Sequence, residues 1–180
     1  LICLLETIPE SALRAFGTAI EERLARRGMR RAPIVVSCDL AAELGKAGVV
    51  LSASGAGKAF VDPRLLAPGA IVCDVARPLD VLSEVKSLRD DVFVYEGGVI
   101  QLPENVSFGA QNVLGYPRGY NLACLSETMV LAMEGAHRHH SLGNMIDYDE
   151  ALHIHDRARQ HGFGFAVLVD GVPCTTRPAR

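Results

Sequence analysis

Five short apolar runs, separated by stretches of helical or turn character, constrain the fold of this 180-residue chain more than any other feature. They cover residues 1–5, 34–37, 49–51, 71–75 and 92–95. The first is a continuous apolar run of the kind that forms a strand buried on both faces, as in parallel sheets. Strands that alternate with helices along a chain form a doubly wound parallel sheet. The sequence therefore predicts an α/β fold with a Rossmann-like sheet.

The chain opens on Leu1, inside the first apolar run, instead of on a methionine. A dinucleotide-binding sheet has six strands, and the first is followed by a glycine-rich turn and a helix. Five strands are expected here, and they correspond to the second to sixth strands of such a sheet. We therefore interpret the chain as part of a longer protein, with the first strand–helix unit missing.

Helical spacing is clear in the segment after the first run. Residues 10–27 are predicted to form a helix that Ser11 caps, because a serine side chain can accept a hydrogen bond from the first turn. Its expected buried stripe consists of Leu13, Phe16, Ile20 and Leu24. Shorter helical pieces are expected at residues 40–46 and 62–66, and residues 81–88 are expected to form a weak helix or an irregular link.

Residues 117–135 are predicted to form a single helix, with Pro117 at its start and Gly135 near its end. Apolar residues recur there at helical spacing, namely Leu122, Leu125, Met129, Ala132, Met133 and Ala136. Cys124 and Glu127 lie three residues apart, so they share a different face of this helix.

The remaining segments complete three expected regions. Residues 100–116 are predicted as a long ordered loop and residues 163–169 as a final strand or extended arm. Residues 149–161 are predicted as a last helix, with Asp147 or Asp149 as its cap and Ala151, Ile154 and Ala158 facing inward. We expect a partial dinucleotide-binding domain over residues 1–98, a helical catalytic segment packed on the sheet over residues 99–169, and a loose tail over residues 170–180.

Composition excludes several classes of function. The net charge of −3 does not favour a nucleic-acid surface. No apolar run reaches the roughly 18 residues that a membrane-spanning helix needs, so no integral membrane segment is expected. Five cysteines without a CxxC pair fit neither a zinc ribbon nor a disulfide framework, which indicates a reduced, cytoplasmic setting. Cys3, Cys38 and Cys73 are predicted as small buried residues. The histidines lack acidic or cysteine partners at zinc-like spacing, and no metal site is predicted.

Glu6 is the first candidate contact for a dinucleotide. It ends the first apolar run, where an acidic residue binds the ribose hydroxyls of NAD and repels the additional phosphate of NADP. The alternative is a surface glutamate at the start of a helix.

The loop after the third strand is the second candidate. Ser52, Ala53, Ser54 and Gly55 follow that strand at the carboxyl edge of the sheet, where ligands of open α/β sheets bind. Small residues allow the backbone to approach a pyrophosphate closely, although a plain flexible turn has the same composition.

Two further strand ends complete the candidate cofactor site. Asp74 ends the fourth strand, and Gly97 and Gly98 end the fifth. The glycine pair would let the backbone pack beside a nicotinamide, and a turn with positive φ explains it equally well.

Cys124 is the candidate nucleophile. A thiolate attacks acyl groups and is also a good leaving group, which suits thioester exchange. A neighbouring carboxylate disfavours the thiolate, so the proximity of Glu127 is not by itself activation. From spacing alone, a thiol in the core is the favoured interpretation.

A resemblance to a known family favours the nucleophile over the core thiol for Cys124. The Ala-Cys-x-x-Glu-x-Met-x-Leu pattern at residues 123–131, with the double glycine upstream, resembles the C-terminal part of the long-chain fatty acyl-carrier-protein reductases that make fatty aldehydes. The segments at residues 49–63, 71–78, 141–143 and 161–163 are similar to that family as well. The likeness extends over residues 1–163 and implies a Rossmann fold.

The resemblance implies a covalent mechanism. It assigns Cys124 as the nucleophile that accepts the acyl group from an acyl-carrier protein or acyl-CoA, and Glu127 to proton handling or to positioning Cys124. The cofactor would be NADP(H) or NAD(H), and an aldehyde-consuming enzyme would be the expected partner. The chain departs from the family in two respects. It lacks the glycine-rich motif and the N-terminal helical domain of the family, and it has Glu6 at a position where the family often has a basic residue.

Two other functions remain as alternatives. One is a dehydrogenase of the shikimate-dehydrogenase type without a covalent step, in which Cys124 only packs. The other is a nucleotide-binding module without catalysis.

Overall fold

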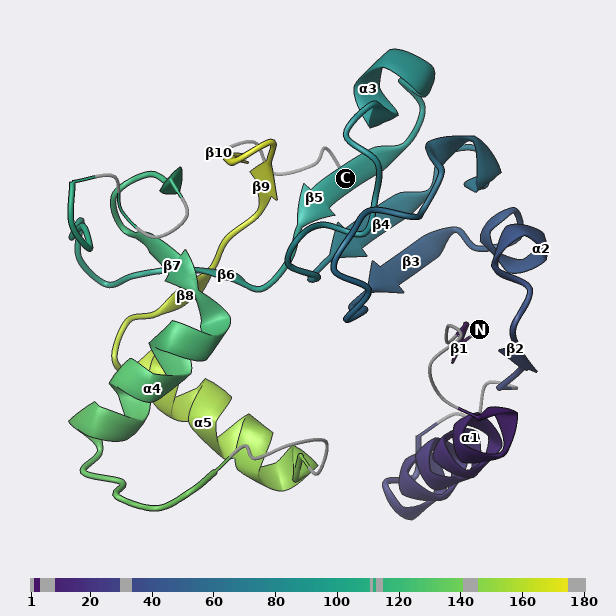
Figure 1. Cartoon of the computed structure of the whole chain (residues 1–180). Coiled ribbons are helices and arrows are strands. Elements are labelled where there is room, and N and C mark those ends of the chain that lie inside the picture. The colour runs from purple at the N-terminus through teal and green to yellow at the C-terminus, as the bar shows by residue number, and fades with distance from the viewer. Residues whose placement is uncertain are drawn as a thin grey trace. The chain divides into compact units, whose positions relative to one another are not determined.

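The computed structural model describes residues 2–3, 9–29, 34–110, 112, 115–140 and 146–174, and the chain divides into two compact units, Leu1–Val94 and Tyr95–Arg180 (Figure 1). The fold is mixed α/β, with parallel strands in the first unit and helices in the second. This agrees with the α/β class predicted from the alternating runs.

Parallel strand pairs form the first unit. β1 (Ile2–Cys3) pairs with β2 (Val36–Ser37), and β3 (Val49–Ser52) pairs with β4 (Ile71–Asp74). The fifth strand, β5 (Phe93–Glu96), begins beside the residue before β4, where the Phe93 N–H donates to the Ala70 carbonyl over 2.9 Å.

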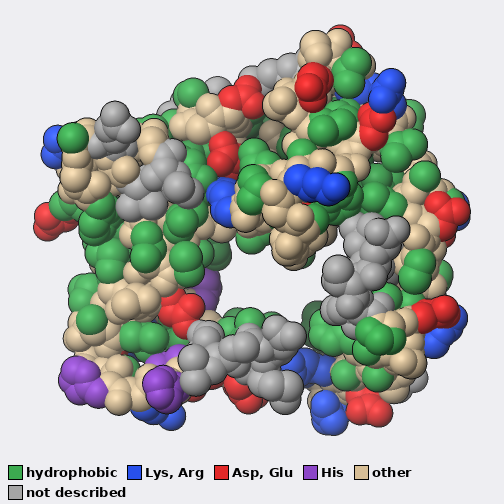
Figure 2. Space-filling view, viewed as in Figure 1, with side chains coloured by type: hydrophobic (Ala, Val, Ile, Leu, Met, Phe, Trp, Pro, Cys, Tyr) green, Lys and Arg blue, Asp and Glu red, His purple; other side chains and the backbone are tan. Residues whose placement is uncertain are grey.

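Only one face of these strands is deeply buried. Val72 of β4 is fully buried in a core with Leu44, Val61, Leu66, Ala70 and Val81. On the other face, Val49 is 74% exposed and Leu51 is 70% exposed. Figure 2 shows that hydrophobic side chains also lie on the surface of the molecule. Burial on both faces, which parallel sheets usually have, is therefore not seen for β3.

The helices of the first unit are α1 (Glu10–Arg26), α2 (Leu40–Leu44), the 3-10 turn η1 (Pro63–Leu65) and α3 (Val85–Leu88). The predicted cap of α1 is wrong: Pro9 precedes the helix and Ser11 lies within its first turn. α1 buries Leu13 as predicted, but Phe16 is 54% exposed. The close contact is instead at Gly17, where a Cβ would lie 3.3 Å from Ile34.

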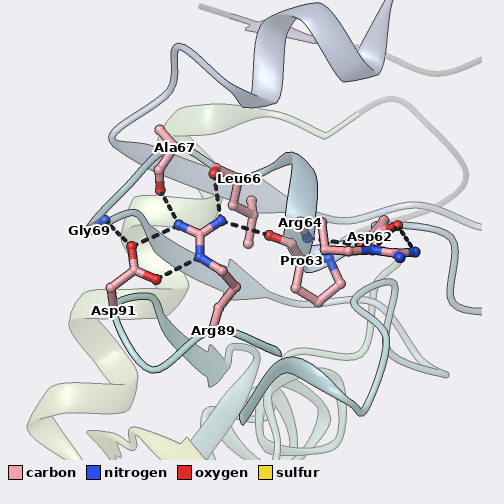
Figure 3. Close-up of polar contacts among 8 residues, drawn as sticks. All are labelled: Asp62, Pro63, Arg64, Leu66, Ala67, Gly69, Arg89 and Asp91. Atoms are coloured by element: carbon pink, nitrogen blue, oxygen red, sulfur yellow. Dashed lines mark hydrogen bonds and ion pairs between the residues drawn. The ribbon is translucent and has the colours of Figure 1, made fainter. Parts of the chain in front are cut away.

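Arg89 ties the loops of this unit together (Figure 3). Its guanidinium donates to the carbonyls of Pro63, Leu66 and Ala67 over 2.9–3.3 Å and forms two hydrogen bonds with Asp91 of 2.6 and 2.8 Å. Asp91 also accepts from the Gly69 N–H. The backbone carbonyl groups at the end of η1 thus receive their hydrogen bonds from one side chain.

Two small antiparallel arrangements form the strands of the second unit. β6 (Val99–Gln101) lies between β7 (Tyr120–Leu122) and β8 (Gly164–Phe165). β9 (Leu168–Val169) pairs with the end of β5 on one side and with β10 (Val172–Pro173) on the other. The predicted loop at residues 100–116 thus begins within a strand, and part of the predicted tail forms β10.

Two packed helices, α4 (Ala123–Met133) and α5 (Tyr148–Gln160), complete the second unit. The side chain of Asp147 caps α5 by accepting from the N–H groups of Asp149 and Glu150, which confirms one of the predicted caps. None of the helices among the described residues is long and apolar enough to cross a membrane.

The predicted start of the catalytic helix is wrong. α4 begins at Ala123, because the residues before it form a turn and β7. Gly119 has a φ of +79°, and its backbone exchanges hydrogen bonds with Leu102 and Val106 across the loop. A left-handed glycine bound to another segment cannot continue a helix.

The predicted buried face of this helix is wrong in part: Met129 packs against a small core as predicted, but other members of the stripe are exposed. Leu125 is 42% exposed and Met133 is 54% exposed, whereas Ser126 and Val130 are buried. Val130 packs with Leu102 and Phe163 in a small core.

Candidate functional site

Cys124 is the second residue of α4 and is exposed. The strand β7 leads directly into the helix, and the Ala123 N–H donates to the Gly98 carbonyl over 2.8 Å. Gly98 has a φ of +69°, so the turn with positive φ that the sequence allowed is present. Cys124 therefore lies in the first turn of the helix, whereas the predicted start at Pro117 would place it about two turns along. The glycine pair lies beside that first turn.

A pocket of about 450 Å³ lies beside α4. It is bounded by α4, α5, β6 and the residues around β8. Its lining consists of Ile100, Ala123, Ser126, Glu127, Ala151, Ile154, His155, Ala158, Arg159, Phe163, Gly164 and Phe165. A volume of this size is typical of small-molecule sites, which hold about 300–1,000 Å³.

The two predicted catalytic residues take different positions at this pocket. Glu127 is half-buried and lines it, whereas Cys124 is exposed and is not one of the lining residues. An α-helix turns by about 100° per residue, so positions three apart are about 60° apart around the helix. Because Ala123 and Glu127 line the pocket, its wall on α4 lies next to Cys124 on the helix surface.

Three polar side chains in this pocket were not predicted from the sequence. The hydroxyl of Ser126 is buried and has no hydrogen-bond partner among the residues that the structure describes. His155 stacks on Phe165 with ring centroids 5.5 Å apart, and Arg159 lines the same pocket. Positions 151, 155 and 158 share one face of α5, and this helical spacing is the signal that the sequence offered.

An ion cluster joins the C-terminal ends of α4 and α5. Glu134 accepts two hydrogen bonds from Arg157, of 2.6 and 2.7 Å, and lies 2.6 Å from Nε2 of His161. Hydrogen bonding to Arg157, and then to His161, lowers the pKa of Glu134 to about 2. The cluster fixes the helices that form two walls of the pocket.

A second cluster lies at the start of α5. Glu150 is 2.9 Å from Arg138 and 2.5 Å from Nδ1 of His140, whose side chain is only 4% exposed. His140 is thus paired with a carboxylate. Within the described ranges of the chain, no three His, Cys, Asp or Glu side chains form a group that could hold a metal ion.

The candidate cofactor loop of the first unit is held by a buried acid. Ser52 donates its hydroxyl to Asp80 over 2.7 Å, and Ser54 donates both its hydroxyl and its N–H to the same carboxylate. Asp80 is 1% exposed and was not predicted from the sequence. Ala53 and Gly55 remain exposed, and a Cβ at Gly55 would meet nothing within 4 Å.

Asp74 supports the neighbouring turn. It is 1% exposed, and its two carboxylate oxygens accept the N–H groups of Ala76 and Val81 over 3.1 and 2.9 Å. Burial raises the pKa of Asp74, and the nearby charge of Asp80 acts in the same direction. These bonds give Asp74 a structural role, and a contact with a cofactor stays a prediction.

The other predicted residues are placed as follows. Glu6 lies outside the described residues. Gly97 is buried between β5 and β6. Cys38 is exposed and Cys73 is half-buried, so the prediction of a buried thiol is wrong for Cys38. The side chain of Cys3 lies outside the described part of the structure.

Comparison with known proteins gives a partial relationship. No protein-family model matches the chain. The chain is 34% identical over 113 residues to a protein named Aminotransferase PigE, from Serratia sp. (strain ATCC 39006). The matched segment covers 63% of this chain but only 13% of that protein. The chain is therefore similar to a small part of a much longer protein.

Proposed function

We propose that this chain is part of a nicotinamide-dependent reductase that converts an acyl thioester to an aldehyde through an acyl group on Cys124. The observation that carries the proposal is the exposed thiol in the first turn of α4, next to a pocket that Ala123 and Glu127 line. The sequence pattern around Cys124 adds the resemblance to acyl-carrier-protein reductases.

The first step needs only the thiol and a thioester. The sulfur of Cys124 forms a bond to the acyl carbon, the bond from that carbon to the carrier sulfur breaks, and the carrier leaves as a thiol. The first turn of a helix has N–H groups without intrahelical partners, which favour negative charge nearby. The exposure of Cys124 allows a large carrier to reach it.

Glu127 is suited to move the proton of this exchange. It lies on the same side of α4 as Cys124 and is half-buried at the pocket. We assign its carboxylate to accept the proton of the attacking thiol and to return it to the departing carrier sulfur. In the reductive step the same group, protonated again from solvent, would supply the proton as the Cys124 thiol is released.

The first unit contains a loop whose residues fit a nicotinamide dinucleotide. The β3–β4 pair is parallel, and the exposed, small residues Ala53 and Gly55 follow the carboxyl end of β3, where dinucleotides bind in Rossmann-like sheets. We infer that this unit is a partial Rossmann-like domain and that residues 53–55 would hold the nucleotide. When bound, a reduced nicotinamide supplies the two electrons that convert the thioester to an aldehyde.

Acylation of Cys124 is the direct test. The purified protein is incubated with an acyl-pantetheine thioester without nicotinamide, and its intact mass and digested peptides are measured. We expect one acyl adduct on the peptide that contains Cys124, and loss of the adduct and of aldehyde formation in Cys124→Ala. Cys38→Ala and Cys174→Ala remove other exposed thiols and should keep both.

Aldehyde formation that persists at the wild-type rate in Cys124→Ala would contradict the covalent step. Nicotinamide-dependent activity on a hydroxy or keto acid, with no acyl adduct on the wild-type protein, would favour the dehydrogenase without a covalent step.

The similarity to a protein named as an aminotransferase suggests what consumes the product. That name does not bear on thioester chemistry, but an aldehyde is an amino acceptor, and aminotransfer converts it to an amine. We propose that the aldehyde passes to an aminotransfer reaction. The protein would be supplied with thioester, reduced nicotinamide, an amino donor and an aldehyde-accepting aminotransferase. Amine should form, whereas an alcohol as the main product would contradict the proposal.

A further inference from the structure

The hydroxyl of Ser126 is buried in the wall of the pocket without a partner among the described residues. Ser126 is only 3% exposed. Serine and threonine within helices often donate to the carbonyl four residues earlier, as Thr128 does to Cys124 over 3.1 Å. Ser126 makes no such bond. A buried hydroxyl without a hydrogen bond is costly, so its position points to a ligand with a polar atom.

The surroundings of Ser126 are mostly apolar. Residues from α5 and from the segment around β8 form the facing walls, with Ile154, Ala158 and Phe163 among them. Pockets of this kind bind ligands that are mainly apolar and are oriented by a few polar groups. The polar side chains at the pocket are Ser126, Glu127, His155 and Arg159.

The pocket is also suitably placed for a group on Cys124. Ala123 precedes Cys124 in the chain, and Glu127 follows it by one turn of α4. A chain attached to the sulfur can pass over Ala123 toward the pocket, where Ser126 lies one turn further along the same wall.

We propose that this pocket holds the acyl chain carried on Cys124, and that Ser126 hydrogen-bonds to a keto or hydroxyl oxygen on that chain. The inference rests on the proposed function only in taking Cys124 as the attachment point. A hydroxyl can donate to a ketone and can accept from an alcohol, so both oxygen types fit. The preferred substrate class is an oxygenated acyl thioester, because a plain chain leaves Ser126 without a partner.

Binding is measured with compounds that cannot react at Cys124. Octanamide and a series of octanamides with a keto group at each inner carbon are titrated into the protein by calorimetry. We expect at least one keto isomer to bind roughly tenfold more tightly than octanamide, the size of effect expected for one buried hydrogen bond. Ser126→Ala should abolish this preference, and Cys124→Ala should retain it.

Three controls make the result specific. Ser126→Cys nearly conserves the side-chain volume, but a thiol is a weak donor, so this variant should also lose the preference for the keto amide. It provides the test if Ser126→Ala fails to fold. Ser107→Ala removes an exposed hydroxyl elsewhere in the same unit and should leave the preference unchanged. Ala151→Phe narrows the pocket and should weaken octanoyl transfer to Cys124 while acetyl transfer continues.

The outcomes separate the two proposals. Equal binding of plain and keto amides, or a keto preference that survives in both Ser126 variants, overturns this inference. Failure of every thioester to acylate Cys124 overturns the proposed function, while a Ser126-dependent keto preference in the amide titration would still support the pocket.

Discussion

Cys124 and Ser126 are two residues apart on α4 but have opposite surroundings. Positions two apart are about 200° apart around a helix, which turns one side chain to solvent and the other to the pocket. The thiol is exposed and the hydroxyl is 3% exposed. The chemistry of the thiol is evident from the sequence, whereas the importance of the serine depends on its burial, which only the packed helices create.

Asp74 carries the first prediction at the residue scale. Its two oxygens accept backbone N–H groups, and asparagine can offer only one acceptor while directing an amide toward the other N–H. Asp74→Asn should therefore lower the free energy of unfolding by about 1–3 kcal/mol, the cost of an unsatisfied buried donor. Urea unfolding followed by circular dichroism measures the change.

Asp90→Asn is the matched control, because Asp90 is an exposed acid in the same unit. Its unfolding free energy should stay within about 0.5 kcal/mol of the wild-type value. An Asp74→Asn protein as stable as the Asp90→Asn protein would show that the two backbone bonds do not matter.

At the scale of elements, the C-terminal end of η1 is anchored to the core around Val72 by one of two adjacent leucines, Leu65 in the turn and Leu66 directly after it. Leu66 is 3% exposed and lies in the core, whereas Leu65 is 37% exposed. Leu66→Ala should cost about 2–5 kcal/mol, as deletion of a buried leucine side chain does. Leu65→Ala should cost less than about 1 kcal/mol, and urea unfolding of the pair measures the contrast. Equal costs would contradict the packing of η1.

Arg89 holds the same element from the polar side (Figure 3). Lysine keeps the charge but cannot form the planar pair of bonds with Asp91 while also reaching the η1 carbonyls. Arg89→Lys should lower the melting temperature. Arg64→Lys, at an arginine whose side chain is 70% exposed, should change it much less. A thermal melt that does not distinguish these two variants would refute the role of Arg89.

The joined ends of α4 and α5 predict a dependence of stability on pH. The pKa of Glu134 falls from 4.5 to about 2 in the folded protein, so its ion pairs stabilise the fold fully above about pH 4.5. That stabilisation is lost as the pH falls from about 4.5 toward 2, because the folded carboxyl becomes protonated.

Glu134→Gln should remove this part of the pH dependence. Wild-type stability should fall more steeply than that of the variant across this acidic window, as measured by urea unfolding at each pH. Glu104→Gln, at an exposed glutamate of the same unit, should keep the wild-type slope. Parallel slopes for wild type and Glu134→Gln would exclude the pairing with Arg157 and His161.

At the scale of the whole molecule, the proposed reaction requires two units with different strand arrangements. The first has parallel strands with exposed loop residues after β3, and the second has antiparallel strands and the α4–α5 pocket. The alternation of apolar runs with helical segments along the sequence predicted the parallel strands. It did not predict the antiparallel sheet, because β6, β7 and β8 are short and come from distant parts of the chain.

The sequence by itself determined the local structure: the apolar runs that form β3 and β4, the helical spacing of α1 and α5, and the Asp147 cap. Only the tertiary structure decided where α4 begins and which of its faces is buried. Pairing with β6 takes up residues 120–122 as a strand, and packing on Leu102 and Phe163 buries Val130. Periodicity shows that a helix has an apolar face, but its partners, which lie far away in the sequence, decide which face they cover.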